Sequence, residues 1–195
     1  MITVLMGKSA SGKDTILNKL KNEGFVPLVS TTTRPMREGE IDGKDYNFIS
    51  AEEFKKKIEN NDFIEYRSYN TLVNNIAEVW YYGLSKQEIN PSRDYVTILD
   101  VDGTKSLLDY YGERNCFIVS VEADDKLREQ RAMSRGSFDR CEWDRRFKDD
   151  ASKFNNDEIS KIANFRIYNE GKLENALIEF NKAYVAYKSS KESKK

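Results

Sequence analysis

The sequence predicts an α/β fold in which helices flank a parallel sheet and a smaller lobe interrupts the core. Short apolar runs, typical of buried strands, alternate with helical patterns along most of the chain. The first apolar run leads directly into a glycine-rich loop and then a helix. Residues 31–85 break the alternation, because they contain strands, one helix and few apolar runs. Strands that alternate with helices indicate a parallel sheet with right-handed crossovers.

The individual elements follow from apolar runs, capping residues and glycines. Strands are expected at 1–6, 25–30, 61–69, 95–103, 116–123 and 164–170. Helices are expected from Ile16 toward Gly24, at 51–60 after the capping pair Ser50 and Glu53, briefly after a second pair at Ser85 and Glu88, within the arginine-rich stretch 124–153, and from Leu173 to Tyr187. The polar tail KSSKESKK is expected to be disordered.

The charge composition narrows the possible functions. The 195 residues include 32 basic and 33 acidic side chains and no histidine. A net charge of −1 gives no general attraction to nucleic acid or membrane, so an anion site must be built locally. Without histidine, proton transfer would need carboxylates, lysine or water. Phosphoryl transfer suits such a chain, because it depends mainly on positioning and charge.

Other features of the sequence concern its cellular location. Cys116 and Cys141 lack metal-site spacing and are expected to be buried or idle thiols in a reducing compartment. The sequence shows neither a signal peptide nor an apolar run of about 18 residues. We therefore expect a cytoplasmic protein without nucleic-acid or membrane partners. The sequence leaves open whether it is a monomer or a homodimer.

Residues 7–15, GKSASGKDT, begin with the G-x-x-x-x-G-K pattern of a phosphate-binding P-loop, the Walker A motif. In such a loop, backbone N–H groups surround phosphate oxygens, helped by the positive end of the following helix. Gly7 and Gly12 would permit the tight path, and Lys13 would reach the outer phosphates. The alternative is a turn that matches by accident, which the strand–loop–helix context disfavours. The predicted ATP-binding residues of the loop are Gly7, Lys8, Ser9, Ala10, Ser11, Gly12, Lys13, Asp14 and Thr15.

Two aspartates are predicted metal partners. Asp14 stands where a P-loop normally has the Ser or Thr that holds Mg²⁺, and a carboxylate is also a hard oxygen ligand. Alternatively, Asp14 only favours the helix N-terminus, while Thr15 or water serves the metal. Asp100 lies at the carboxyl end of an expected strand, where ligands bind in open α/β sheets. The alternative for Asp100 is a cap on the helix that begins near Gly103.

Arginine is concentrated late in the chain. Arg131 and Arg135 are four residues apart, so they would share one helix face. Arginine binds phosphate with two parallel hydrogen bonds and stabilises a transferring phosphoryl group. The alternative is a solvated, salt-bridged helix, because Asp and Glu are interleaved. The arginines of this cluster are Arg128, Arg131, Arg135, Arg140, Arg145 and Arg146.

The stretch STTTRPMREGEIDGKDYNFIS, which begins at Ser30, resembles the monophosphate-binding segment of the guanylate kinases. The resemblance continues through AEEF, NNDFIEY, YYG, ILDVDG, the arginines Arg131 and Arg135, and YNE at 168–170, and so covers nearly the whole chain. It implies a P-loop NTPase core at 1–30 and 86–190 with an arginine lid near 131–146. It also implies an inserted GMP-binding lobe at 31–85, with 191–195 as a disordered tail.

The resemblance also implies a role for each matching residue. Ser30, Arg34, Arg37, Tyr46 and Tyr82 would hold the phosphate of GMP, and Glu65 and Asp102 would read guanine. The transferring phosphoryl group would be surrounded by Lys13, Arg34, Arg131, Arg135 and Arg146. Asn169 would contact the adenine side of ATP.

Three features depart from the family pattern. The P-loop has Lys8, Ala10 and Asp14 where the family usually has Pro, Gly and Ser. Leu84 follows YYG where the family has a Ser or Thr that touches the base. The segment NTLVNNIAEVW is longer than the family's turn. The last two departures fall on the base pocket and bear on the preference for GMP.

The implied activity is ATP-dependent phosphorylation of GMP or dGMP to GDP or dGDP, with Mg²⁺. One alternative is a kinase for another nucleoside monophosphate or for a sugar phosphate. A second is a guanylate-kinase-like module that binds protein partners, which the retained loop and arginines disfavour. Nothing in the sequence directly supports a third, a nucleotide-regulated switch.

Overall fold

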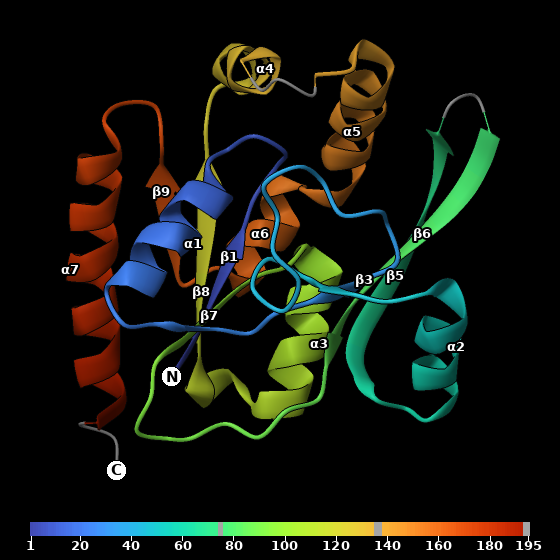
Figure 1. Ribbon diagram of the computed structural model, residues 1–195. Coiled ribbons are helices and arrows are strands. Elements are labelled where there is room, and N and C mark those ends of the chain that lie inside the picture. The colour runs from blue at the N-terminus through green and yellow to red at the C-terminus, as the bar shows by residue number, and fades with distance from the viewer. Residues whose placement is uncertain (74–75, 135–137, 193–195) are drawn as a thin grey trace. The chain divides into compact units, whose positions relative to one another are not determined.

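The computed structural model describes residues 1–73, 76–134 and 138–192 (Figure 1). The chain forms two compact units. We call Met1–Pro27 together with Arg93–Lys195 the core unit, and Leu28–Ser92 the lobe unit. The lobe expected at 31–85 lies within the lobe unit.

The core unit is built on a five-stranded sheet in the order β2-β7-β1-β8-β9. All its neighbouring strands are parallel, which confirms the predicted class. Its strands are β1 (Ile2–Met6), β2 (Val26–Pro27), β7 (Tyr95–Ile98), β8 (Cys116–Glu122) and β9 (Phe165–Tyr168).

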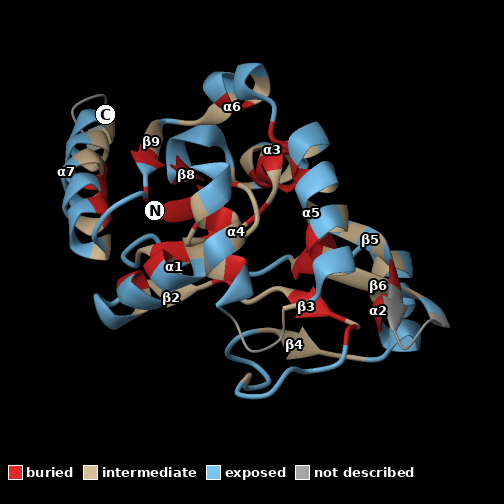
Figure 2. Ribbon diagram, turned by 90° about the horizontal axis from the view of Figure 1, so that it is seen from above, coloured by how far each residue is buried: buried red, intermediate tan, exposed pale blue. Residues whose placement is uncertain are grey.

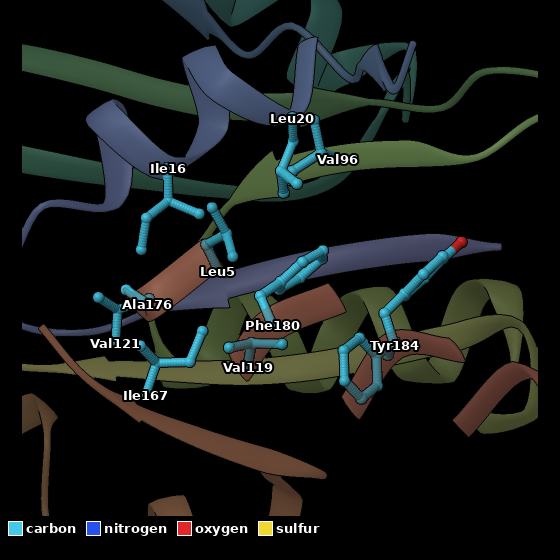
Figure 3. Close-up of a cluster of buried hydrophobic side chains, with 11 residues drawn as sticks. Leu5, Ile16, Leu20, Val96, Val119, Val121, Ile167, Ala176, Phe180 and Tyr184 are labelled. Carbon is cyan, nitrogen blue, oxygen red and sulfur yellow. The ribbon is translucent and has the colours of Figure 1, made fainter. Parts of the chain in front are cut away.

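Helices cover the two faces of this sheet, so β1 is buried at every position. Helices α1 (Lys13–Asn22) and α7 (Leu173–Glu192) pack on one face, and α3 (Val101–Tyr111) contacts β1 and β8 from the other. Figure 2 shows α7 with buried residues along one side and exposed residues along the other. Leu5 of β1 meets Ile16 of α1 and Phe180 of α7 in a common apolar cluster (Figure 3).

The remaining helices of the core unit lie on either side of β8 in the chain. They are the short 3₁₀ helix η1 (Glu113–Asn115) before it, and then α4 (Asp125–Met133), α5 (Arg140–Lys153) and α6 (Asn156–Ile162). Asp124, Asp139 and Asn155 cap the last three, each accepting a hydrogen bond from a backbone N–H of the first turn. The caps at Asp124 and Asp139 explain why the expected helical stretch 124–153 divides into α4 and α5, and α6 is a further helix beyond it.

The lobe unit has a four-stranded sheet in the order β4-β3-β6-β5. Its strands are β3 (Thr31–Thr32), β4 (Asn47–Phe48), β5 (Phe63–Val73) and β6 (Ile76–Ser85), with β5 and β6 paired as a long antiparallel hairpin. Helix α2 (Ala51–Glu59) begins with the predicted capping box, in which Ser50 and Glu53 bond each other's backbone. Phe54 of α2 stacks on Phe63, with ring centroids 4.4 Å apart.

Four expectations about elements were wrong. No helix follows Ser85, because Ser85 pairs with Phe63 as the last residue of β6 and its backbone is therefore extended. The strand expected at 25–30 is only Val26–Pro27. The strand expected at 95–103 ends at Ile98, and Asp100 caps α3. The tail expected to be disordered is helical through Glu192, since Lys188 bonds Asp94 at 2.9 Å.

The two cysteines differ in burial. Burial of Cys116 raises the pKa of its thiol to about 12. Cys141 is exposed, so only Cys116 is a buried thiol.

Candidate active site

The predicted P-loop lies between the end of β1 and the start of α1, at the edge of the sheet where parallel strands end. Gly7 and Gly12 have φ angles of 147° and 100°, which favour glycine. A Cβ at Gly7 would lie 2.2 Å from the Val121 carbonyl oxygen, and one at Gly12 would lie 2.2 Å from Asn169 Nδ2. Gly7 is therefore required by a close backbone contact as well as by its conformation, whereas Gly12 is favoured by its conformation, because Asn169 Nδ2 is the end of a side chain. Ala10 has a left-handed backbone conformation, with a φ of 58°, although it carries a side chain.

Lys13 lies over the loop that precedes it. Its Nζ donates to the carbonyl oxygens of Gly7 at 2.7 Å and Lys8 at 2.9 Å. Asp14 and Thr15 follow in the first turn of α1, and both are exposed. Gly12 provides no side chain to cap this helix, and a helix N-terminus favours anions. The loop thus combines a lysine and a helix N-terminus suited to phosphate.

Arg131 and Asn169 contact the loop from two other elements. Arg131, in α4, donates to the carbonyl oxygens of Ser11 at 3.3 Å and Asn169 at 2.7 Å. Asn169 follows β9, is 4% exposed, and donates from Nδ2 to the Ser11 carbonyl oxygen at 2.8 Å. The structure therefore brings together three predicted ATP-site elements that are far apart in the sequence.

Arg128 and Asp150 also contact the loop, and neither was predicted as a site residue. Arg128 Nε donates to the Ser9 carbonyl oxygen at 2.8 Å, and Ser9 N–H donates to Asp150 Oδ2 at 2.7 Å. Arg128 was recognised only as a member of the arginine cluster, and no sequence signal marks Asp150.

The other predicted arginines are in different environments. Arg146 donates from Nε to Glu142 at 2.6 Å, and Arg145 donates to the same carboxylate. Burial alone would raise the pKa of Glu142, but these bonds outweigh it and lower that pKa to about 2. Arg140 pairs with Glu129 and Asp144, as the salt-bridged alternative expected. Arg135 lies outside the described residues.

Asp100 and Asp102 are close in sequence but differ in environment. Asp100 follows β7, next to β1, and accepts from Gly103 N–H at 2.8 Å as the N-cap of α3. The capping alternative is therefore correct for one oxygen of Asp100. The side chain of Asp102 is 69% exposed and lies 3.9 Å from Lys105 Nζ.

A cavity of about 190 Å³ opens beside the start of the P-loop. Gly7 and Lys8 form one side, the end of β8 with Ser120 and Glu122 forms another, and Phe154 contributes an apolar wall. It gives the loop a neighbouring space at the sheet edge.

In the lobe unit, Arg34 is the best-positioned of the predicted phosphate ligands. It is 4% exposed, and its two Nη atoms bind the two carboxylate oxygens of Glu40, with Nη1 at 2.7 Å from Oε2. Burial disfavours the charged guanidinium, yet the bond and charge of Glu40 outweigh it and raise the pKa of Arg34. The bond from Arg34 in turn lowers the pKa of Glu40. Glu40 was part of the recognised motif, but its role as partner of Arg34 was missed.

Two predicted tyrosines surround Arg34. Its guanidinium lies 5.0 Å from the centroid of the Tyr46 ring, and the Tyr82 ring is 6.0 Å from that of Tyr46. Such contacts orient a guanidinium without using its hydrogen-bond donors. The other two predicted phosphate ligands are less enclosed: Ser30 accepts from Asn47 N–H through its carbonyl at 2.9 Å, and Arg37 is exposed.

Glu65 lies in β5, which pairs with the strand β6 that carries Tyr82. It is 9% exposed, and its carboxylate is 3.9 Å from Arg67 Nη1. In the ladder it pairs with Leu84, which is fully buried. Because directly paired residues share a sheet face, Leu84 and Glu65 lie on one side of the hairpin. The longer segment at 70–80 continues β5 and β6 as far as Val73 and Ile76.

Across residues 1–73, 76–134 and 138–192, no group of three or more Asp, Glu, Cys or His side chains is arranged to hold a metal ion. No helix in the described part of the chain combines the length and apolar character needed to cross a bilayer.

The fold and the loop together define a P-loop phosphate-binding protein of the α/β class. The guanylate kinase family model matches residues 1–136. Over 195 residues the chain is 33% identical to the guanylate kinase of Clostridium acetobutylicum, covering 96% of this chain and 86% of that protein. It is 34% identical to the guanylate kinase of Clostridium tetani over 144 residues, covering 70% of this chain and 64% of that protein.

Similarity extends to a solved structure. The crystal structure of guanylate kinase from Anaplasma phagocytophilum superimposes with a TM-score of 0.68 at 25% identity, covering 96% of this chain and 86% of that one. The chain therefore belongs to the guanylate kinase family.

Proposed function

We propose that the chain transfers the γ-phosphoryl group of ATP to GMP or dGMP, giving ADP and GDP or dGDP. The observation that carries this proposal is the P-loop, whose two glycines have positive φ angles and whose Lys13 lies over the turn. Family membership supports ATP as donor and Mg²⁺ as its usual companion. The proposed partners are thus small nucleotides.

For ATP, we assign the phosphates to the loop from Gly7 to Thr15 and the transferring group to Lys13, Arg131, Arg135 and Arg146. Arg131 is supported by its contact with Ser11, and Asn169 by its contact with the same carbonyl. Arg146 would exchange its bond with Glu142 for one with phosphate. We keep the assignment of 131–146 as an arginine lid within this proposal.

For Mg²⁺, the oxygen donors near the loop fit a partial ligand set. Mg²⁺ usually keeps several waters and takes only one or two protein carboxylates beside substrate phosphates. Asp14 is exposed in the first turn of α1, and Asp100 follows the strand next to β1. We assign Asp14 as the nearer ligand, directly or through water, and Asp100 as the second partner. When bound, the ion neutralises charge on the phosphates.

For GMP, we assign the phosphate to Ser30, Arg34, Arg37, Tyr46 and Tyr82, and the base to Glu65 and Asp102. Guanine presents N1–H and N2–H₂ donors that a carboxylate accepts, whereas adenine lacks that pair. A buried acceptor left unpaired by the wrong base is costly, so Glu65 would discriminate strongly. Arg34 also belongs to the catalytic set, because a guanidinium stabilises charge that develops during transfer.

Catalysis in this proposal needs no histidine. Positioning of the two nucleotides for in-line attack, together with lysine and arginine charge, supplies most of the rate enhancement. A second candidate is a kinase for another nucleoside monophosphate. It is favoured by one observation, the buried Leu84 paired with Glu65, because an apolar side chain there cannot donate to a base. A cytoplasmic location, and a monomeric or homodimeric state, remain parts of the proposal.

The test is a coupled assay of ADP release with Mg-ATP and each nucleoside monophosphate in turn. GMP-selective turnover is expected. Turnover of another monophosphate in preference to GMP would favour the second candidate, and no turnover with any of them would contradict the kinase proposal. Asp14→Ser and Asp14→Asn, titrated with Mg²⁺, test the metal assignment. If Asp14 is a ligand, Asp14→Asn should raise the Mg²⁺ concentration for half-maximal activity about tenfold, which corresponds to about 1.4 kcal/mol.

A further inference from the structure

Ser9 of the P-loop is held by two residues from helices α4 and α5. Asp150, in α5, accepts Ser9 N–H at 2.7 Å and Ser9 Oγ–H at 3.2 Å. Arg128, in α4, donates from Nε to the Ser9 carbonyl oxygen at 2.8 Å. The same two residues pair with each other, Arg128 Nη2 to Asp150 Oδ2 at 2.5 Å. One loop residue is therefore bonded through its N–H, its carbonyl and its hydroxyl.

The two side chains that hold Ser9 are buried, and Arg128 lies beside two aromatic rings. Arg128 is 1% exposed and Asp150 is 8% exposed. The guanidinium of Arg128 lies 5.5 Å from the Phe147 ring and 5.8 Å from the Trp143 ring, both in α5. A buried ion pair is weak evidence for stability, because the loss of hydration offsets the attraction. Its three bonds to a single loop residue therefore point to a role in positioning.

The charges near this pair balance. Asp125 accepts from Arg128 Nη1 at 2.6 Å and lies 3.9 Å from Lys8 Nζ. The two cations and two carboxylates sum to zero. Asp150 can therefore lie against a phosphate-binding loop without adding net repulsion toward the phosphates.

The position of Ser9 in the loop gives these bonds a consequence. The next residue, Ala10, is left-handed, a conformation disfavoured for a residue with a side chain. Bonds to both peptide groups of Ser9 restrict the backbone that leads into Ala10. The two helices also carry Arg131 and Arg146, which the proposed function assigns to the transferring phosphoryl group.

We infer that Arg128 and Asp150 form a clamp that positions the P-loop for the phosphates of ATP and ties it to the helices that carry the arginines. The inference rests on the proposed function for the identity of the nucleotide and for the role of these arginines. Both are positioning residues, because they would act on the nucleotide through the P-loop that they contact.

Asp150→Asn is the main test. An Asn oxygen can still accept from Ser9 N–H and Arg128, with its NH₂ donating to Ser9 Oγ. The amide is neutral, however, so the charge-assisted bond from the buried Arg128 is weakened. We expect the KM for Mg-ATP to rise about tenfold, while the KM for GMP stays within about twofold. Equilibrium binding of a non-hydrolysable ATP analogue should weaken by the same factor. Asp150→Glu, which keeps the carboxylate, should recover part of the loss.

Asp149→Asn is the matched control, because Asp149 is the adjacent residue of α5 and pairs with Lys153 at 3.0 Å. It should change neither KM. If Asp150→Asn lowers the melting temperature and kcat but leaves the KM for ATP unchanged, the pair is only structural and the inference is overturned. If the unmodified protein shows no turnover, the proposed function fails, while analogue binding still tests the clamp.

Hydrogen exchange in the unmodified protein guards against a variant that does not fold. The Ser9 amide should be strongly protected both with and without ATP, since its acceptor belongs to the protein. Exchange as fast as that of an unstructured amide would overturn the inference.

Discussion

The P-loop of the core unit and the Arg34 cluster of the lobe unit, made of Arg34, Glu40, Tyr46 and Tyr82, both suit phosphate, but their hydrogen bonds span very different distances along the chain. Loop contacts join residues far apart in sequence: Arg128 with Ser9 across 119 positions, Ser9 with Asp150 across 141, and Asn169 with Ser11 across 158. In the lobe unit, Arg34 binds Glu40 across six positions, and Arg37 N–H binds the same carboxylate across three.

This difference predicts which substitutions should affect a site from a distance and which should affect only the segment in which they lie. A loop positioned by three distant elements can be disturbed from any of them. The bonds of Glu40 to Arg34 and Arg37 form within one short segment, so they should respond mainly to changes in that segment. The following variants test that contrast.

Lys13→Met should have the largest effect. It removes the charge that lies over the loop, and we expect kcat to fall about 10³-fold, as when a donor to transition-state charge is removed. The KM for GMP should change little if the Arg34 cluster is independent of the P-loop. Lys19→Met, on an exposed position of the same helix, is the control. Steady-state kinetics with both nucleotides varied measures the effect, and a kcat within tenfold of the unmodified enzyme would contradict the assignment.

Glu40→Gln should weaken GMP binding at the Arg34 cluster without affecting the P-loop. It leaves Arg34 with one acceptor oxygen instead of a paired carboxylate. We expect the KM for GMP to rise about tenfold, or about 1.4 kcal/mol, with the KM for ATP within about twofold. Glu38→Gln, exposed in the same loop, is the matched control. An equal rise in both KM values would break the contrast between the two sites.

Acid should weaken the core unit through Glu142. Burial opposes its ionisation, but bonds from Arg145 and Arg146 lower its pKa from 4.5 to about 2. A carboxyl whose pKa is lowered by folding stabilises the folded state fully above about pH 4.5, and this contribution is lost as the pH falls toward about 2. At pH 7 Glu142→Gln should cost about 1 kcal/mol. Thermal melts should show the gap between the two proteins closing between pH 4.5 and 2, and a constant gap would contradict this account.

Ser50→Ala should have the smallest effect. It removes the side-chain acceptor of the α2 capping box, at a cost of about 0.5 to 1 kcal/mol. Neither KM should move more than about twofold, because the cap holds only the start of α2. Urea unfolding measures the cost. A larger change in the KM for GMP would show that the Arg34 cluster also depends on helix α2.

Local patterns accounted for the parts of the structure that are built locally. Strand β1, the loop from Gly7 to Lys13 and helix α1 follow one another in the chain, so spacing alone could predict them. The capping box at Ser50 was predicted for the same reason. A similar pair at Ser85 and Glu88 misled, because the ladder partner of Ser85 is Phe63, and pairing across the hairpin overrode the local preference.

The chain alone therefore determined the α/β class, the phosphate loop and the residues of the Arg34 segment, since each depends on neighbours within one turn, strand or motif. Tertiary structure decided that Arg128, Asp150 and Asn169 meet the loop, that Leu84 is buried opposite Glu65, and that α7 continues through Glu192. The physical reason is that these contacts depend on how distant helices and strands pack. Many sequence spacings are compatible with such packing, and only burial in the folded chain selects one.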